Sequence, residues 1–523
     1  MLDSKPNTQK LKNMKKIALY IPLIALLMTV SGCEEGFDEL NVNPTAATAL
    51  NPLFTFNNAM INTTFPGGTI VFEHPIVQQM FSPNSGVLAG GNFNVDNPGA
   101  SGVNAAIWQR YYRDVIRYLV DVMAKTKDDA NRTNLYHMAR IWKAYAFMVL
   151  TDTYGDIPYK EAGLGFLGTN VTPKYDAQQS IYDDIIKELT EATAALDAAK
   201  PIEAGDIAYG GNIAKWKKFG YSVLLRAGMR LTKVNPTLAQ ATAVKAVAGG
   251  VILTNADNGL IRNNANFQNP IGTMLNSTEA ANFYLTRHFV NYLNANADPR
   301  LASIAVRYVG AKSGAEHTAA RANRDPAVQI GMPMGFDNGT IPAQAIADKL
   351  ASFYDYSQLD RTRLAKLDAP TFMVTAAQTQ LLLAEAAQRG WISGSAADYY
   401  TAGVTAHMQQ LGDADANSAV PAAAITAYLQ KNPYMAANGL ELINTQYWVA
   451  SFLNGPEVFA NFRRSGFPKL TPNPYPGKEI KGNFINRITY PDSEKAVNKA
   501  NQTEALSRQG PDNQDSRVWW DKQ

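Results

Sequence analysis

Four aromatic side chains stand in polar stretches of the sequence, each close to side-chain amides. Phe93 lies between Asn92 and Asn94 in the Gly- and Asn-rich segment 82–102. Phe267, Phe336 and Tyr354 have Asn269, Asn338 and Gln358 near them. An aromatic face can stack on a sugar ring while amides hydrogen-bond its hydroxyl groups. The pattern favours a ligand site that uses Asn92, Phe93, Asn94, Phe267, Asn269, Phe336 and Tyr354, and the alternative is that these rings fold onto the body of the protein.

The residue types that usually carry catalysis form no recognisable pattern. The sequence has no Gly-x-Ser-x-Gly elbow, no Walker loop and no dinucleotide fingerprint. Asp152 and Asp156 could be read as a carboxylate pair, but they flank a turn, where Asp usually bonds its own backbone. The five histidines are scattered and include no zinc motif. We therefore expect no catalytic residue, no metal and no cofactor, which favours a binding protein over an enzyme.

Helices must position these residues, and the clearest one is predicted over residues 135–151. Apolar residues recur there at three- and four-residue steps, and the other sides are nearly as apolar. A helix that is apolar almost all round lies inside a fold, and Gly155 and Pro158 end this one. Similar spacing predicts helices over 107–122, 181–189, 216–231, 237–248, 372–389, 396–411, 421–430, 440–452 and 493–506. This is an all-α pattern, and helix pairs of this length suggest a solenoid core of tetratricopeptide-like pairs, although no clean repeat signature is present.

Residues 251–370 interrupt the helical pattern. Short apolar pieces lie there among Asn, Gly and Pro, which predicts loops, short helices and a small strand pair. We expect an irregular, loop-rich insertion packed against the solenoid, so that residues 58–523 form a single domain. The ligand site would lie between the 82–102 loop and residues 251–360, because long polar loops on a rigid scaffold are often functional.

The N-terminus resembles the export signal of a bacterial lipoprotein. Five lysines precede an apolar run at residues 17–30, which is too short to span a bilayer comfortably but suits a secretory signal. The run ends in Val-Ser-Gly-Cys, which resembles a lipobox and makes Cys33, the only cysteine, the expected lipidation site. Residues 1–32 would be the signal peptide, with its start at Met1 or Met14, and residues 33–57 an extended tether. Several acyl chains on Cys33 would anchor the protein stably to a membrane.

Composition supports a folded, anchored body with no preference for nucleic acid. Hydrophobic residues make up 46% of the chain and charged residues 18%, which is typical of a globular protein. Five of the 48 basic residues and one of the 45 acidic residues fall in the signal segment, so the remainder is close to neutral. No other apolar run is long enough to cross a membrane. An acidic cluster at residues 34–39 is either a surface-export signal or a solvated part of the tether.

A series of motifs, in order along almost the whole chain, resembles the SusD/RagB family of nutrient-binding outer-membrane lipoproteins, and most closely its SusD-like branch. The motifs are LTDTYGDIPY at 150–159, WKKF at 216–219 with LRAGMR at 225–230, DPR at 298–300, LLLAEA at 381–386, QYW at 446–448, FRRSGFP at 462–468, RITYP at 487–491 and VWWD at 518–521. Phe459 stands where the family commonly has Trp, and Ile485 replaces an expected Pro. Both departures affect packing more than function.

The resemblance implies a helical fold with tetratricopeptide-like pairs and a lipoprotein that sits on a SusC-like, TonB-dependent transporter. Such a protein would face the cell exterior, capture oligosaccharides or other oligomeric nutrients, and pass them to the barrel. Ligand contacts are not part of the shared motifs, so none can be transferred to this sequence. Three alternatives stay open at this point: a peptide-binding uptake component, a helical glycoside hydrolase at the cell surface, and a scaffold without a small ligand.

Overall fold

The structure is a computed structural model that describes residues 50–84, 104–165 and 167–522. Residues Pro52–Gln523 form one compact unit, separate from residues 1–51. The expected signal peptide, Cys33, the acidic cluster and the candidates Asn92, Phe93 and Asn94 lie outside the described residues. Within the described ranges, no helix combines the length and the hydrophobicity needed to cross a membrane.

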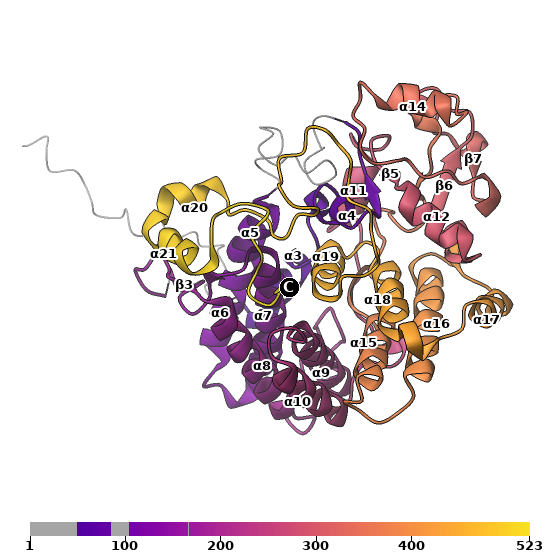
Figure 1. Ribbon diagram of the computed structural model, residues 1–523. Coiled ribbons are helices and arrows are strands. Elements are labelled where there is room, and N and C mark those ends of the chain that lie inside the picture. The colour runs from indigo at the N-terminus through magenta and orange to yellow at the C-terminus, as the bar shows by residue number, and fades with distance from the viewer. Residues whose placement is uncertain (1–49, 85–103, 166, 523) are drawn as a thin grey trace, which may run out of the picture. The chain divides into compact units, whose positions relative to one another are not determined.

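The first half of the unit is a run of helices, most of which pack on the next helix along the chain (Figure 1). They are α3 (Pro52–Asn62), α5 (Ala106–Tyr111), α6 (Arg117–Thr126), α7 (Thr133–Tyr154), α8 (Gln178–Ala195), α9 (Ile213–Arg230) and α10 (Pro236–Gly249), with a π-helical turn at Tyr112–Ile116. Glycine permits the close approach of α9 to α10, since a Cβ at Gly228 would lie 2.8 Å from Thr242. The helix predicted at 135–151 is confirmed as α7, which is buried on nearly all sides.

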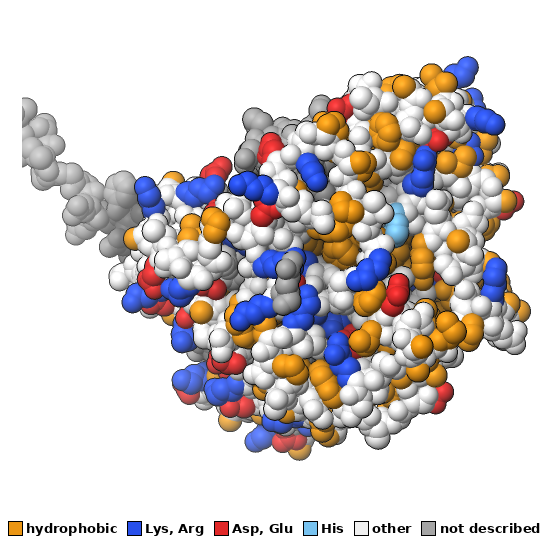
Figure 2. Space-filling view, viewed as in Figure 1, with side chains coloured by type: hydrophobic (Ala, Val, Ile, Leu, Met, Phe, Trp, Pro, Cys, Tyr) orange, Lys and Arg blue, Asp and Glu red, His pale blue; other side chains and the backbone are white. Residues whose placement is uncertain are grey.

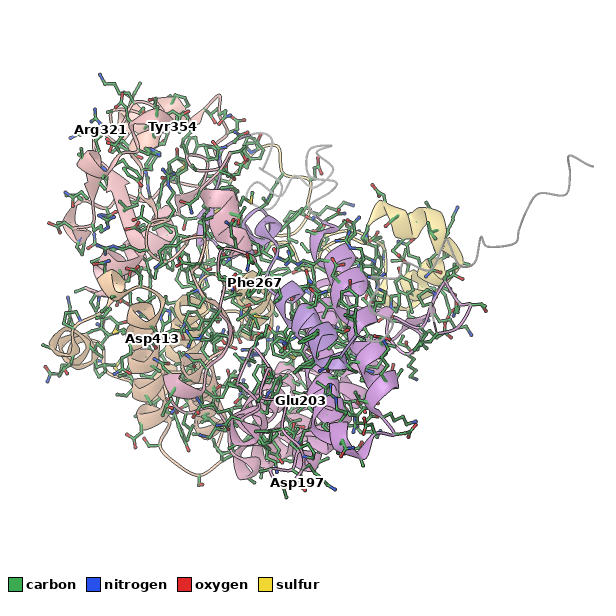
Figure 3. All side chains as sticks on the ribbon, turned by 180° about the vertical axis from the view of Figure 1, so that it is seen from behind. Asp197, Glu203, Phe267, Arg321, Tyr354 and Asp413 are labelled. Atoms are coloured by element: carbon green, nitrogen blue, oxygen red, sulfur yellow. The ribbon has the colours of Figure 1, made fainter. Side chains whose placement is uncertain are left out.

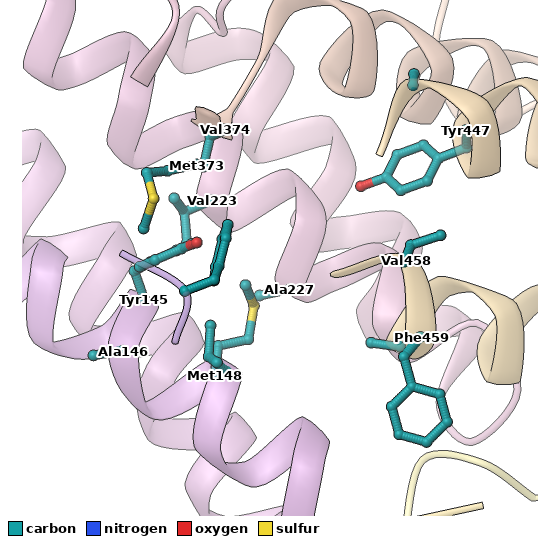
Figure 4. Close-up of a cluster of buried hydrophobic side chains, with 14 of the residues drawn as sticks. Tyr145, Ala146, Met148, Val223, Ala227, Met373, Val374, Tyr447, Val458 and Phe459 are labelled. Atoms are coloured by element: carbon teal, nitrogen blue, oxygen red, sulfur yellow. The ribbon is translucent and has the colours of Figure 1, made fainter. Parts of the chain in front are cut away.

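The second half repeats this arrangement with α15 (Ala376–Gln388), α16 (Ala396–Ala414), α17 (Ala422–Lys431), α18 (Gly439–Ala450) and α19 (Gly455–Ser465). Helix α15 packs on α16 and α18, and α18 packs on α19. The two halves meet where α19 contacts α7 and α15 contacts α9. Figure 4 shows part of this junction, with Tyr145 and Met148 of α7, Ala227 of α9 and Val458 of α19. The helical, all-α fold class is confirmed.

Short elements occupy the region between the two halves, as the sequence predicts for residues 251–370. The helices there are α11 (Pro270–Leu275), α12 (Arg287–Ala295), α13 (Arg300–Ile304) and α14 (Ile341–Ala347). The strands are β4 (Gly259–Ile261), β5 (Tyr284–Leu285), β6 (Ala305–Tyr308), β7 (Ala322–Asn323) and β8 (Gln358–Leu359). Strand β6 lies between β7 and β8, while β5 pairs antiparallel with β1 (Met80–Phe81), which follows the short helix α4 (Glu73–Ile76). A further pair, β2 (Ile157–Pro158) and β3 (Tyr175–Asp176), follows α7.

Three sequence predictions of element boundaries are wrong. The extended tether cannot reach residue 57, because α3 begins at Pro52; proline is favoured in the first turn, where its missing N–H is not needed. The helix predicted from 372 begins only after β9 (Thr371–Val374), which pairs with β4, and Thr375 starts α15 with a capping box. The single helix at 493–506 is two helices, α20 (Asp492–Val497) and α21 (Lys499–Gln509), separated at Asn498.

Buried ion pairs connect the family-like motifs across the core. Asp152 of α7 accepts hydrogen bonds from Tyr182 (2.5 Å) and from the indole of Trp520 (2.8 Å). Arg230 of α9 reaches both Asp152 (3.1 Å) and Glu457 of α19 (2.7 Å). Buried charges persist only when they are paired in this way, so these motifs hold distant parts of the chain in one arrangement.

Candidate functional site

The described candidate residues lie in three different places rather than in one site. Figure 3 shows Tyr354 near Arg321 at one end of the molecule and Phe267 well away from it. Tyr354 stacks on Phe353, with ring centroids 4.2 Å apart, and meets His317 edge-on. Phe336 is half-buried against a small hydrophobic cluster that includes Phe81.

Asn269 has a structural role in the fold. Its Oδ1 accepts the N–H of Gly272 (2.9 Å) and so caps α11, while its Nδ2 donates to the carbonyl of Ala369 (3.0 Å). Phe267, two residues earlier, is half-buried. Binding of a ligand by Phe267, Asn269, Phe336 or Tyr354 therefore stays a prediction, and these four residues do not share a single pocket.

An open groove of about 490 Å³ beside α12 is the most suitable described place for an extended ligand. One wall is α12, with Arg287, His288, Asn291 and Tyr292, and the others are Gln78, residues 333–334 and residues 471–474. Figure 2 shows the face that carries α12, α18 and α19, which is hollowed and exposes hydrophobic side chains in the hollow. We call this feature the α12 groove.

Two partly exposed rings on α12 give the groove its aromatic surface. His288 and Tyr292 are four residues apart, so they project from one face of the helix. Buried Trp448 of α18 supports both rings edge-on, at centroid distances of 5.8 Å each. Gln446, in the same QYW motif, donates a hydrogen bond to the Tyr292 hydroxyl (3.0 Å). The motif that suggested family membership thus positions the rings of the groove.

The groove carries little net charge. Partial burial lowers the pKa of His288, so its ring is neutral at physiological pH. Burial also raises the pKa of Tyr292 well above its usual value, so it remains a phenol. The guanidinium of Arg287 is paired with Asp348. Neutral rings next to amides such as Asn291 suit an uncharged, polyhydroxylated ligand better than an ionic one.

The groove also includes Gln78, which precedes the 82–102 segment by four residues in the chain. Gln78 has a left-handed backbone, with φ of 55°, and its side chain donates to the Thr471 carbonyl (2.5 Å). A non-glycine residue in this conformation is strained, and such strain concentrates at binding sites. Strand β1 begins two residues later and leads toward the 82–102 loop, while Phe336 follows Met334 of the groove wall. The groove wall therefore includes Met334 of the region 251–360, which was proposed from the sequence, and Gln78, which lies just before the other proposed region, 82–102.

Sequence reasoning missed His288 and Tyr292 because both lie on a helix, where aromatic residues are normally assigned to the core. One sequence pattern could have identified them: His288 and Tyr292 are four residues apart on a short helix whose exposed side is otherwise polar. The structure places Asp152 in the buried ion-pair network, while Asp156 accepts the N–H of Gln178 (2.9 Å). Among the described residues, no cluster of three His, Cys, Asp or Glu side chains could hold a metal ion.

Comparison with known proteins assigns the family. A family model described as "Starch-binding associating with outer membrane", SusD-like, matches residues 44–491. The chain therefore belongs to the SusD-like family, as the motifs predicted. A comparison with curated proteins returns no match.

Solved structures agree over nearly the whole chain. A chitin-binding protein is 31% identical, with a TM-score of 0.78, and the match covers 90% of this chain and 100% of that one. A chitin-binding SusD homologue from Flavobacterium johnsoniae is 27% identical, with a TM-score of 0.73, and the match covers 90% and 98% of the two chains. A structure named Bacteroidetes AC2a SusD-like is 26% identical, with a TM-score of 0.78 and coverage of 91% and 100%. The fold is that of the SusD-like proteins.

Proposed function

We propose that this protein captures oligosaccharides at the outer membrane and passes them, uncleaved, to a SusC-like, TonB-dependent transporter. The α12 groove supports the capture step, because it presents neutral rings and amides in an open channel that can accept an extended chain. Two of the similar structures are described as chitin-binding, so β-linked N-acetylglucosamine chains are the first ligands to test.

The anchoring part of the proposal rests on the sequence. The resemblance of Val-Ser-Gly-Cys to a lipobox predicts acyl chains on Cys33, and the family description is association with the outer membrane. A tethered body that faces the cell exterior could hold a nutrient next to a transporter. Co-purification of the native protein with an outer-membrane barrel tests this partnership, and its absence under mild detergent would refute it.

A calorimetric screen tests the capture step. We expect the purified chain to bind at least one oligosaccharide from a panel of chitohexaose, cellohexaose and maltohexaose, and not to bind a mixture of short peptides. Tyr292→Ala should weaken binding about tenfold, which corresponds to the loss of about 1.4 kcal/mol of contact between the ring and a sugar unit. Tyr136→Ala is the matched control, because Tyr136 is also half-exposed on a helix but does not line the groove. Tight peptide binding without oligosaccharide binding would instead identify a peptide-uptake component.

A further inference from the structure

A second concave feature lies apart from the α12 groove, between the irregular insertion and the helices α15, α16 and α18. It is a largely enclosed cavity of about 50 Å³. Its walls are mostly apolar, with Phe65, Ile271, Leu364, Phe372, Leu411 and Phe452 among them. Leu453 also lines it and has a left-handed backbone, with φ of 69°. The cavity therefore combines an apolar lining with local backbone strain of the kind found at ligand sites.

Most polar groups in the lining are already engaged by the protein. Asn269 caps α11, Gln378 accepts from Arg226 (2.7 Å) and donates to Ser451 (3.0 Å), and Asn454 donates to the Met373 carbonyl (3.2 Å). Gln410 differs from them. Its side chain is only 6% exposed, and within the described structure its buried Oε1 has no hydrogen-bond partner. An unpaired buried acceptor destabilises a folded protein, so this group is a candidate for contact with a ligand.

His407 supplies a donor on the same side of α16. It precedes Gln410 by three residues, which places both side chains on one face of the helix, and both line the cavity. The guanidinium of Arg300 approaches His407 Nδ1 at 3.0 Å, and a guanidinium can only donate. Nδ1 must therefore accept, which leaves the imidazole neutral with its proton on Nε2. The lining of the cavity thus includes a neutral imidazole and a carboxamide from one face of α16, among apolar side chains.

The size of the cavity limits its occupant. A water molecule needs roughly 10–15 Å³ by this measure, so 50 Å³ takes about four non-hydrogen atoms. A fatty acyl chain or a whole sugar ring is too large. An acetamido group has the right size, and it joins an apolar methyl to a carbonyl acceptor and an N–H donor.

We propose that this cavity receives the N-acetyl group of an amino sugar, with His407 donating to its carbonyl oxygen and Gln410 Oε1 accepting its N–H. The methyl group then lies among the apolar side chains. Phe267 is half-buried and precedes the cavity residue Asn269 by two positions in the chain. This inference rests on the proposed capture of oligosaccharides and names N-acetylated chains as the preferred class.

The test compares two ligands with the same β-1,4 backbone, chitohexaose and cellohexaose, by calorimetry on the full chain. We expect the wild-type protein to prefer chitohexaose by about tenfold or more, the effect of one or two buried hydrogen bonds. Gln410→Leu should remove most of that preference while leaving the affinity for cellohexaose unchanged. Ala414→Phe, which fills the cavity from a partly exposed position on α16, should have the same effect.

Gln380→Leu is the matched control, because Gln380 also has a buried, unpartnered Oε1 but does not line the cavity. The Gln380→Leu variant should prefer chitohexaose as strongly as the wild type does. Measurement of the unfolding midpoint of each variant shows whether it is folded. Equal affinity of the wild type for both sugars, or an unchanged preference in the two cavity variants, would overturn the N-acetyl assignment while capture of oligosaccharides still stands. Failure of the wild type to bind any oligosaccharide would refute the proposed function itself.

Discussion

Replacement of Glu385 by Gln tests whether a buried ion pair holds helices α15 and α19 together within the second half of the helical core. Glu385 of α15 and Arg464 of α19 each have a side chain only 1% exposed, and the guanidinium reaches the two carboxylate oxygens at 2.7 Å each. Asn444 donates to the same carboxylate (3.1 Å). The substitution keeps the shape of the side chain but leaves the charge of Arg464 buried without its main partner.

Two independent arguments give a similar loss of unfolding free energy for Glu385→Gln. Despite burial, which favours the neutral acid, the charge of Arg464 and the hydrogen bonds lower the pKa of Glu385 from 4.5 to about 2. At about 1.4 kcal/mol per pKa unit, the carboxylate contributes about 3 kcal/mol at neutral pH. Removal of one partner from a buried pair costs roughly 3–5 kcal/mol in other proteins. We therefore expect Glu385→Gln to lower the free energy of unfolding by about 3 kcal/mol.

Denaturant unfolding of the purified chain, followed by circular dichroism, measures this loss. Because the pKa is lower in the folded state, the contribution is complete above pH 4.5 and disappears as the pH falls toward 2. The difference between wild type and variant should shrink over that range. Glu441→Gln, at an exposed position in the first turn of α18, is the control and should change stability by less than about 0.5 kcal/mol. A loss below about 1 kcal/mol for Glu385→Gln, or a difference independent of pH, would refute the reasoning.

Three other predictions follow from single positions. Burial raises the pKa of Glu73 to about 8, so the folded state favours the protonated form of this side chain. The free energy of unfolding of the wild type should therefore fall as the pH rises from 4.5 to 8. The urea midpoint of Glu73→Gln should fall less over the same range. Gly155→Ala should destabilise by more than about 1 kcal/mol in thermal unfolding, because φ is +85° and the new Cβ would overlap Gln509; Gly390→Ala, with positive φ but open space, should cost less. Cys33→Ser should move the protein from the membrane fraction to the soluble fraction of cells, and retention in the membrane would argue against lipidation.

The helical framework could be predicted from the sequence because its signals are local. The three- and four-residue spacing of apolar residues identified α7 and most other helices, and Gly155 marked the end of α7 correctly. Errors arose where tertiary pairing decides the structure. The apolar residues that follow Phe372 in the sequence recur at helical spacing, yet pairing with β4 makes Phe372 part of a strand. Pro52 falls within the predicted tether at 33–57, although proline is a favoured residue of the first helical turn.

The candidate site was harder to predict because it depends on residues far apart in the chain. The α12 groove joins Gln78, α12 and residues 471–474, and no sequence pattern reports that these meet. The rule that aromatics in loops bind ligand pointed to Phe336, near the groove, but equally to Tyr354, which packs on Phe353 and His317. The rings of His288 and Tyr292 owe their position to Trp448 and Gln446, more than 150 residues later in the chain.

The central claim is that the protein holds an oligosaccharide and does not cut it. The most direct measurement incubates the purified chain with chitohexaose, determines binding by calorimetry, and then analyses the same sample by chromatography. We predict saturable binding that Tyr292→Ala weakens about tenfold, with the hexamer recovered at its original length. Shortened products that disappear on mutation of one Asp or Glu, or no binding of any oligosaccharide, would contradict this account.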